Sequence, residues 1–177
     1  MNYIIFDLEA TCEKNNRNFP NEIIEIGAIK INERKEIVDI FNVFVKPKVN
    51  STLTEFCKEL TSITQQDVDN AQLFPSAIKE FKDWIGDEPF TLCSWGFYDK
   101  KQIEKDSIRH GLSYSWANKH VSLKHQFADI KGIRPCGMEK ALKILNLPLD
   151  GTHHRGIDDA KNIGKIFIKC FDKWDIK

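Results

Sequence analysis

The sequence lacks any hydrophobic run long enough to cross a bilayer. None of its 177 residues lies in an uninterrupted apolar stretch that approaches the roughly 20 residues of a transmembrane helix. The first residues have no basic segment and reach an acid at Asp7, which is unlike a signal peptide. We therefore predict a cytoplasmic protein with no membrane segment.

Cysteines are few and widely separated, and no two of them form a C-x-x-C pair. This pattern is typical of reduced thiols in a cytosolic protein rather than of a disulfide framework. Cys136 together with His120 and His125 matches no standard zinc spacing, so we do not expect a zinc module. The five cysteines are Cys12, Cys57, Cys93, Cys136 and Cys170.

Net charge is also absent, because 26 Lys and Arg residues balance 26 Asp and Glu residues. This balance argues against a chain that coats nucleic acid or membrane over its whole surface. The charges are unevenly distributed, however. Residues 1–99 carry 10 basic and 17 acidic residues, a net of −7, and residues 100–177 carry 16 and 9, a net of +7. The division is compatible with an acidic pocket beside a basic face, or with chance on a solvated surface.

No internal repeat, low-complexity tract or Gly/Ser linker divides the chain, so we expect residues 1–177 to form a single domain. The first three predicted strands follow one another closely, which favours an antiparallel meander. Short apolar runs rich in β-branched and aromatic residues predict strands over residues 2–8, 22–32, 36–46, 90–95 and 121–123.

Helical patterns fill much of the remaining sequence. Thr64 and Asp67 have the spacing of a capping box, and apolar residues from 77 to 85 recur at helical spacing before Gly86. Further helices are predicted over residues 99–109, 138–145 and 158–174. Strands followed by alternating helices and strands predict an α/β fold with a mixed central sheet, its first three strands antiparallel, flanked by helices.

Two acidic residues stand near the end of the first predicted strand. Asp7 and Glu9 are two positions apart, so both side chains leave the same face of the strand. Ionised carboxylates at such a position are costly unless something compensates their charge. Paired oxygen donors suit Mg²⁺ or Mn²⁺. The alternative is that the end of the strand is solvated and the two acids bind no metal ion.

Two later clusters also carry acids where helices are predicted to begin. Asp99 follows the fourth strand, and His154 precedes Asp159 by five residues in a Gly-containing loop. Either acid alone is explained by capping of a helix N-terminus. The order of the three clusters, D-x-E, then D after a strand, then H-x-x-x-x-D at a final helix, is far more specific.

That order resembles the DEDDh branch of the 3′–5′ exonucleases, which have a ribonuclease-H-like, three-layer fold. Residues 6–12 (FDLEATC), 56–65 (FCKELTSITQ) and 154–159 (HRGIDD) look most like the Eri-type subgroup, which is related to bacterial sporulation-inhibitor-like exonucleases. The resemblance spans residues 3–171, so we expect no added RNA-binding domain. Ser62, Ser51 and Tyr98 stand where that subgroup usually has Gly, Pro and Trp.

The resemblance implies a metal-dependent 3′–5′ exonuclease that hydrolyses the terminal phosphodiester of single-stranded RNA or DNA and releases nucleoside 5′-monophosphates. It implies two divalent cations, Mg²⁺ or Mn²⁺, with His154 as the general base. Glu9 would also contact the attacking water and the substrate. The metal ligands implied are Asp7, Glu9, Asp99 and Asp159.

Further contacts with the terminal nucleotide follow from the same resemblance. The backbone around Ala10 would meet the 3′-hydroxyl group, near Glu9 and His154. Phe56 and Leu60 would flank the terminal base, because apolar faces accept any base; packing in the core is an equally simple role for both. Independently of the resemblance, several cations lie close in sequence to two of the motifs. They are candidates for steering phosphate towards the site, although a solvated helix face is the simpler role for any one of them. These cations are Lys100, Lys101, Lys105, Arg109 and Arg155.

Two other functions remain open at this point. A nucleic-acid-binding or regulatory module could retain the exonuclease fold without turnover, and another ribonuclease-H-like nuclease could cut internally. The intact set of five motif residues favours the exonuclease.

Overall fold

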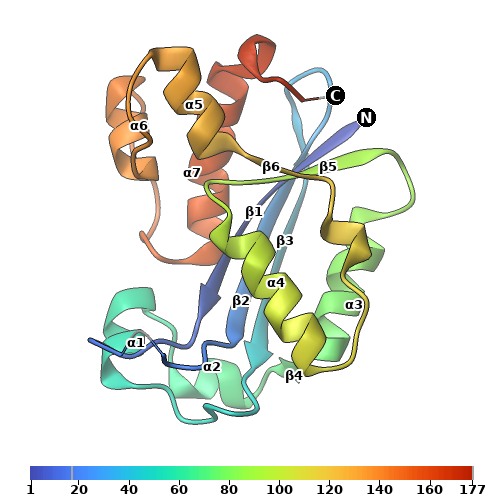
Figure 1. Ribbon diagram of the computed structural model, residues 1–177, viewed down its shortest axis with the longest axis vertical. Coiled ribbons are helices and arrows are strands. Elements are labelled where there is room, and N and C mark those ends of the chain that lie inside the picture. Colours follow the sequence, from blue (N-terminus) through green and yellow to red (C-terminus); the bar gives the residue numbers. More distant parts are fainter. Residues whose placement is uncertain (17, 177) are drawn as a thin grey trace.

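The computed structural model describes residues 1–16 and 18–176, which form a six-stranded mixed sheet with helices on both faces (Figure 1). The strand order is β4-β3-β2-β1-β5-β6. Strands β1, β2 and β3 form an antiparallel meander, while β5 is parallel to β1, β6 to β5 and β4 to β3. The predicted mixed sheet is therefore confirmed. The strands are β1 (Asn2–Ala10), β2 (Ile23–Ile31), β3 (Ile37–Lys46), β4 (Gln72–Leu73), β5 (Phe90–Ser94) and β6 (His120–Ser122).

Seven α-helices and two short 3₁₀ helices lie within the described ranges. The capping box predicted at Thr64 and Asp67 begins α2, and Gly86 ends α3 with a φ of 79°. The helix predicted over 158–174 begins earlier and gives way to a 3₁₀ turn, and two helices, α1 and α5, were not predicted. The helices are α1 (Glu55–Thr61), α2 (Gln65–Asp69), α3 (Phe74–Ile85), α4 (Tyr98–Arg109), α5 (Leu123–Lys131), α6 (Met138–Ile144) and α7 (Gly156–Lys169), with 3₁₀ helices at Ser115–Ala117 and Phe171–Lys173.

None of the helices in the described part of the chain has both the length and the apolar character required to cross a membrane. Cytoplasmic placement stays a prediction of the sequence.

Alternation along β1 sends its side chains into two separate cores. Phe6 faces the layer formed by α3 and α4, where it packs near Phe81. Ile5 faces the opposite layer, in which α7 covers β1 and β2 (Figure 1). Because side chains alternate along a strand, Asp7 and Glu9 share the face of Ile5 and point towards the α7 layer.

The beginning of α7 lies directly on the backbone of the sheet. A Cβ added to Gly27 in β2 would come within 2.1 Å of the Ile157 nitrogen. One added to Gly156 would lie 3.1 Å from the carbonyl oxygen of Asp7. Two glycines therefore let the first turn of α7 approach the strand that carries Asp7.

Candidate active site

A cavity of about 480 Å³ opens between the end of β1, the beginning of α4 and the loop before α7. All five residues of the predicted catalytic set line it, and so do two of the predicted substrate contacts. These residues are Asp7, Glu9, Asp99, His154 and Asp159, with Ala10 and Leu60. Residues that are up to 152 positions apart in the sequence thus meet at one site.

Three carboxylates form the centre of this cavity. Oxygen atoms of Asp7, Glu9 and Asp159 all lie within 4.8 Å of one another. Burial, followed by the charge of Asp159, raises the pKa of Glu9 to about 9. Burial and the nearby Asp99 likewise raise the pKa of Asp7 well above its usual range. These carboxylates lie close together, all are negative when ionised, and all offer oxygen donors. Such a group fits a hard divalent cation, which would supply the compensating positive charge.

Asp99 lies beside this group, tied to β1. Its Oδ1 atom accepts a hydrogen bond of 3.2 Å from the Leu8 backbone nitrogen, between the two acids of the first motif. Burial raises the pKa of Asp99 to about 6, although hydrogen bonds from Ser94 and Leu8 act in the opposite direction. The N-cap of α4 is Phe97, so Asp99 does not have the capping role that offered the simpler explanation.

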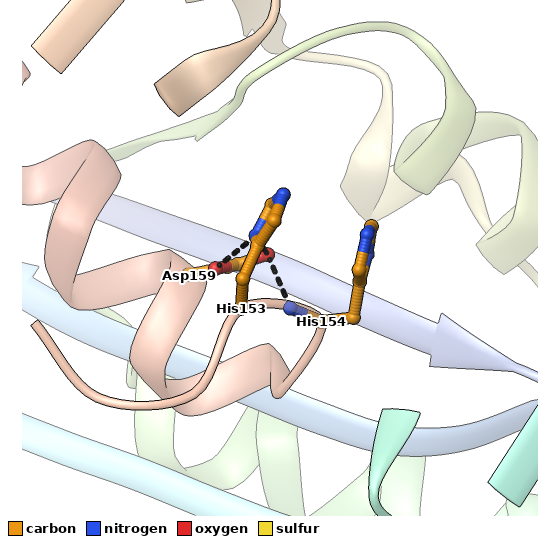
Figure 2. A group of neighbouring side chains, drawn as sticks. All are labelled: His153, His154 and Asp159. Carbon is orange, nitrogen blue, oxygen red and sulfur yellow. Dashed lines mark hydrogen bonds and ion pairs between the residues drawn. The ribbon is translucent and has the colours of Figure 1, made fainter. Parts of the chain in front are cut away.

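The third motif brings two histidines, not one, to Asp159 (Figure 2). The backbone nitrogen of His154 donates to Asp159 Oδ2 over 3.1 Å, and the Nδ1 atom of His153 lies 3.0 Å from both carboxylate oxygens. The two imidazole rings stack with centroids 4.0 Å apart. Burial, then the neighbouring His153, lowers the pKa of His154, which favours its neutral form.

His153 was not predicted as a site residue. Its only signal is its position next to His154, and nothing in the spacing shows that its ring turns back onto Asp159. The loop takes that course because His154 adopts a left-handed backbone conformation, with a φ of 65°.

The two predicted base contacts differ in their placement. Leu60 lines the cavity, whereas Phe56 is not among the lining residues. Both side chains are half-buried, and neither belongs to the buried cluster beneath α1, which contains Cys57 and Ile63. The structure therefore gives no support to a core-packing role for either residue.

Three of the predicted steering cations are engaged elsewhere. Arg155 donates through Nε and Nη2 to the two carboxylate oxygens of the fully buried Glu25, over 3.1 and 3.2 Å. Arg109 forms an ion pair with the buried Asp106, and Lys100 donates to the carbonyl oxygen of Asn118. These contacts contradict a free, phosphate-steering role for both arginines.

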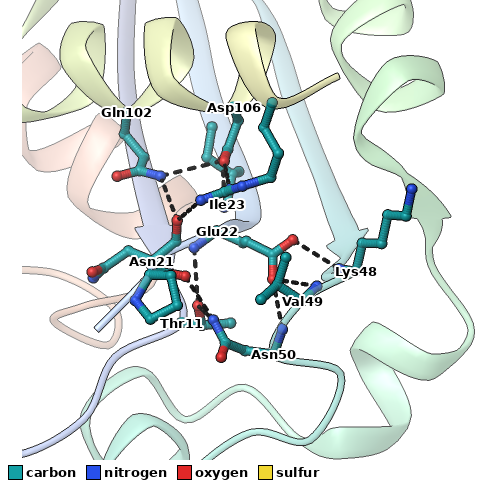
Figure 3. Close-up of polar contacts among 11 residues, drawn as sticks. Thr11, Asn21, Glu22, Ile23, Lys48, Val49, Asn50, Gln102 and Asp106 are labelled. Carbon is teal, nitrogen blue, oxygen red and sulfur yellow. Dashed lines mark hydrogen bonds and ion pairs between the residues drawn. The ribbon is translucent and has the colours of Figure 1, made fainter. Parts of the chain in front are cut away.

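Two other buried acids, Glu22 and Asp106, join segments that are distant in the sequence (Figure 3). The carboxylate of Glu22 accepts from the backbone nitrogens of residues 48, 49 and 50 over 2.7–2.8 Å. Asp106 Oδ2 accepts from the Ile23 nitrogen over 2.8 Å, which joins α4 to β2. Part of the acidity of the 1–99 segment is therefore structural.

Comparison with solved structures places this fold among known ones. The nuclease domain of 3′hExo, a DEDDh family member bound to rAMP, superposes with a TM-score of 0.92 at 32% sequence identity, over 97% of this chain and 92% of that one. A structure of a 3′-exonuclease that recognises the histone mRNA stem-loop matches 96% of this chain and 63% of that one, with a TM-score of 0.91 at 30% identity. The fold is therefore the ribonuclease-H-like fold of DEDDh exonucleases, as the motif order predicted.

Sequence comparison gives the family. A model of the Exonuclease family matches residues 4–167. The 3′-5′ exoribonuclease 1 of Rattus norvegicus is 35% identical over 180 residues, which cover 93% of this chain and 51% of that protein. The probable 3′-5′ exonuclease KapD of Bacillus subtilis is 29% identical over 168 residues, covering 93% and 82%.

The chain belongs to the Exonuclease family, in its DEDDh branch and of the Eri and KapD type. This family uses divalent metal ions, in agreement with the carboxylate cluster. The chain spans about half the length of the first curated relatives that it matches.

Proposed function

We propose that this chain is a 3′–5′ exonuclease that releases nucleoside 5′-monophosphates from the 3′ ends of single-stranded RNA or DNA. The observation that carries the proposal is the convergence of all five motif residues on one cavity. Several relatives are named as exoribonucleases, which favours RNA as the first substrate to test. Because the described elements share one sheet and one site, we further propose that residues 1–177 act as one catalytic domain.

The metal ligands in this proposal are Asp7, Glu9, Asp99 and Asp159. When two Mg²⁺ or Mn²⁺ ions are bound, they supply the positive charge that activates the attacking water and stabilises the leaving 3′-oxygen. Asp7, Glu9 and Asp159 are close enough to share ions, and Asp99 is held beside them by Leu8.

His154 is the general base in this proposal, and its neutral imidazole accepts the proton of the attacking water. Glu9 orients the same water, while Ala10 and Leu60 contact the terminal nucleotide at the cavity wall. Phe56 lies outside that wall, so a contact with the terminal base requires its ring to turn towards the cavity.

The test uses a 5′-labelled, single-stranded RNA oligonucleotide with Mg²⁺ or Mn²⁺, and with EDTA as the metal-free control. We expect the wild type to shorten the RNA stepwise from the 3′ end. The rate of shortening should be at least about 100-fold lower in Asp7→Asn. The matched control is Asp39→Asn, which changes an exposed strand carboxylate. Equal hydrolysis by Asp7→Asn and the wild type would exclude the assignment, and binding without hydrolysis in the wild type would indicate the binding module instead.

Two further measurements separate the remaining alternatives. A circular single-stranded substrate should stay intact, because an exonuclease needs an end; linearised product would indicate internal cutting. His154→Ala should lose about 10²- to 10⁴-fold in turnover and keep Mn²⁺ binding in calorimetry. Loss of Mn²⁺ binding in that variant would reassign His154 as a metal ligand.

A further inference from the structure

An aromatic side chain is exposed at the edge of the cavity. Phe97 leaves 47% of its surface accessible, although aromatic rings contribute most to stability when they are buried. Its two chain neighbours, Gly96 and Tyr98, both line the cavity. Phe97 is not itself among the lining residues, so its ring stands just outside the cavity wall, at the point where β5 passes into α4.

Two histidines hold the Phe97 ring in place. The His125 ring stacks on it, with centroids 4.9 Å apart and an interplanar angle of 30°, and the His120 ring lies 6.0 Å away. His125 Nδ1 is 2.6 Å from the Ser122 hydroxyl group, and His120 Nε2 is 2.9 Å from that of Ser94. Because His125 is itself exposed, the Phe97–His125 pair forms a preorganised aromatic surface that faces solvent.

Lys124 adds a positive charge to the wall of the cavity. It precedes His125 in the chain and lines the cavity, as the single Lys or Arg among the described lining residues. Its backbone nitrogen donates to the Trp95 carbonyl oxygen over 3.0 Å, which ties the beginning of α5 to the end of β5. Sites for single-stranded nucleic acid combine a cation for the phosphate with an aromatic face for the base.

We propose that the Phe97–His125 pair stacks on the base of the nucleotide that precedes the 3′-terminal one. Lys124 binds a backbone phosphate on the same, upstream side of the cavity. This inference rests on the proposed function and adds to it a second nucleotide subsite. Stacking accepts every base, so the subsite binds upstream nucleotides without reading sequence. It also sets a preference for substrates of two or more nucleotides.

The test compares substrates with and without an upstream nucleotide. The p-nitrophenyl ester of thymidine 5′-monophosphate offers one nucleotide, and a series of two-, four- and ten-residue oligonucleotides offers more. In Phe97→Ala, we expect the KM for the oligonucleotides to rise about tenfold and kcat/KM for the ester to stay within about twofold of the wild type. Lys124→Ala should weaken oligonucleotide binding. It should also reduce the slope of log Kd against log salt concentration by about one.

The matched control is Ile108→Ala, which removes another exposed apolar side chain from the far end of α4. It should leave both substrates unaffected. Equal losses on the ester and the oligonucleotides in Phe97→Ala would show that Phe97 only supports Asp99, and would overturn the subsite. Wild-type KM values for the oligonucleotides in that variant would overturn it as well.

A binding measurement keeps this result independent of the proposed activity. Fluorescence anisotropy with a labelled ten-residue RNA, in Ca²⁺ to suppress cleavage, should show an about tenfold higher Kd for Phe97→Ala. An unchanged Kd contradicts the subsite even if the wild type hydrolyses nothing. If the wild type hydrolyses nothing but Phe97→Ala still shows the expected rise in Kd, the proposed exonuclease activity is contradicted and the proposed binding surface is supported.

Discussion

The backbone of Gly27 lies directly against the backbone of Ile157, where α7 begins. A Cβ at residue 27 would stand 2.1 Å from the Ile157 nitrogen, closer than two such atoms can approach. Either β2 or α7 would have to move to admit it. Because Asp159 is only two residues beyond Ile157, this contact sets the distance between Asp159 and the carboxylates of Asp7 and Glu9 on the adjacent β1.

Gly27→Ala should therefore damage both the fold and the carboxylate cluster. We expect the free energy of unfolding to fall by about 1–3 kcal/mol, as in other overpacked interiors, and Mn²⁺ binding to weaken. Denaturant unfolding and calorimetry measure the two effects. Gly96→Ala is the control for stability, because a Cβ there would meet no atom within 4 Å. Wild-type stability and Mn²⁺ affinity in Gly27→Ala would contradict the role of this close approach.

The His153 ring contacts the carboxylate of Asp159, which we assign to the metal site. Its Nδ1 atom is 3.0 Å from both oxygens of Asp159, so an ion at Asp159 competes with this contact. We expect His153→Ala to melt at a lower temperature without metal and to gain more from added Mn²⁺ than the wild type. Thermal melts with and without Mn²⁺ measure the difference. A smaller gain than in the wild type would identify His153 as a ligand instead of a competitor.

The control for this prediction is His154→Ala. The contact of His154 with Asp159 runs through the backbone nitrogen, which the substitution keeps. We therefore expect the Mn²⁺-dependent rise in melting temperature to match that of the wild type.

The acids of the site were predicted from local spacing together with the family resemblance that the order of the motifs carries. The two-residue spacing of Asp7 and Glu9 placed them on one strand face, and the order of the motifs selected Asp159. His153 and Lys124 escaped prediction because their positions depend on contacts between distant segments: a loop that turns back onto α7, and a helix attached to the end of β5. The buried partner of Arg155 was not predicted for the same reason, since Glu25 is 130 positions away.

The Arg155–Glu25 pair is predicted to act on stability and not on substrate steering. Arg155→Met would leave the fully buried Glu25 carboxylate without its bidentate partner, at a cost of about 3 kcal/mol in the free energy of unfolding. Lys105→Met, at an exposed position, should change it by less than about 0.5 kcal/mol. The double variant Arg155→Met, Glu25→Gln should recover part of the stability that Arg155→Met loses. Unchanged stability of Arg155→Met, together with weaker salt dependence of RNA binding, would restore the steering role.

Ser62 stands where related sequences were expected to have glycine, and its backbone shows the reason for that preference. It ends α1 in the left-handed region, with φ 58° and ψ 16°. Ser62→Gly should raise the free energy of unfolding by up to about 1 kcal/mol, because glycine adopts this conformation without a Cβ clash. Ser62→Ala retains the clash and should show no gain. Equal effects of both substitutions in urea unfolding would exclude backbone strain as the cause.

His120 predicts a pH dependence of stability at acid pH. Burial, then the charge of Lys100, lowers the pKa of His120 from 6.5 to about 4 in the folded protein. Between these two values the unfolded chain holds a proton at residue 120 that the folded chain does not, so the free energy of unfolding rises with pH. The contribution is complete above about pH 6.5 and is lost as the pH falls towards 4.

His120→Gln removes this titration and keeps a polar group for the contact with Ser94. Its loss of stability between pH 7 and pH 4.5 should be smaller than that of the wild type, as measured by urea unfolding at each pH. The carboxylates with raised pKa values, Asp7, Glu9 and Asp99, act in the opposite direction. They are present in both proteins, so the difference between the two curves isolates residue 120. Parallel curves would mean that the folded protein protonates His120 as readily as the unfolded chain does.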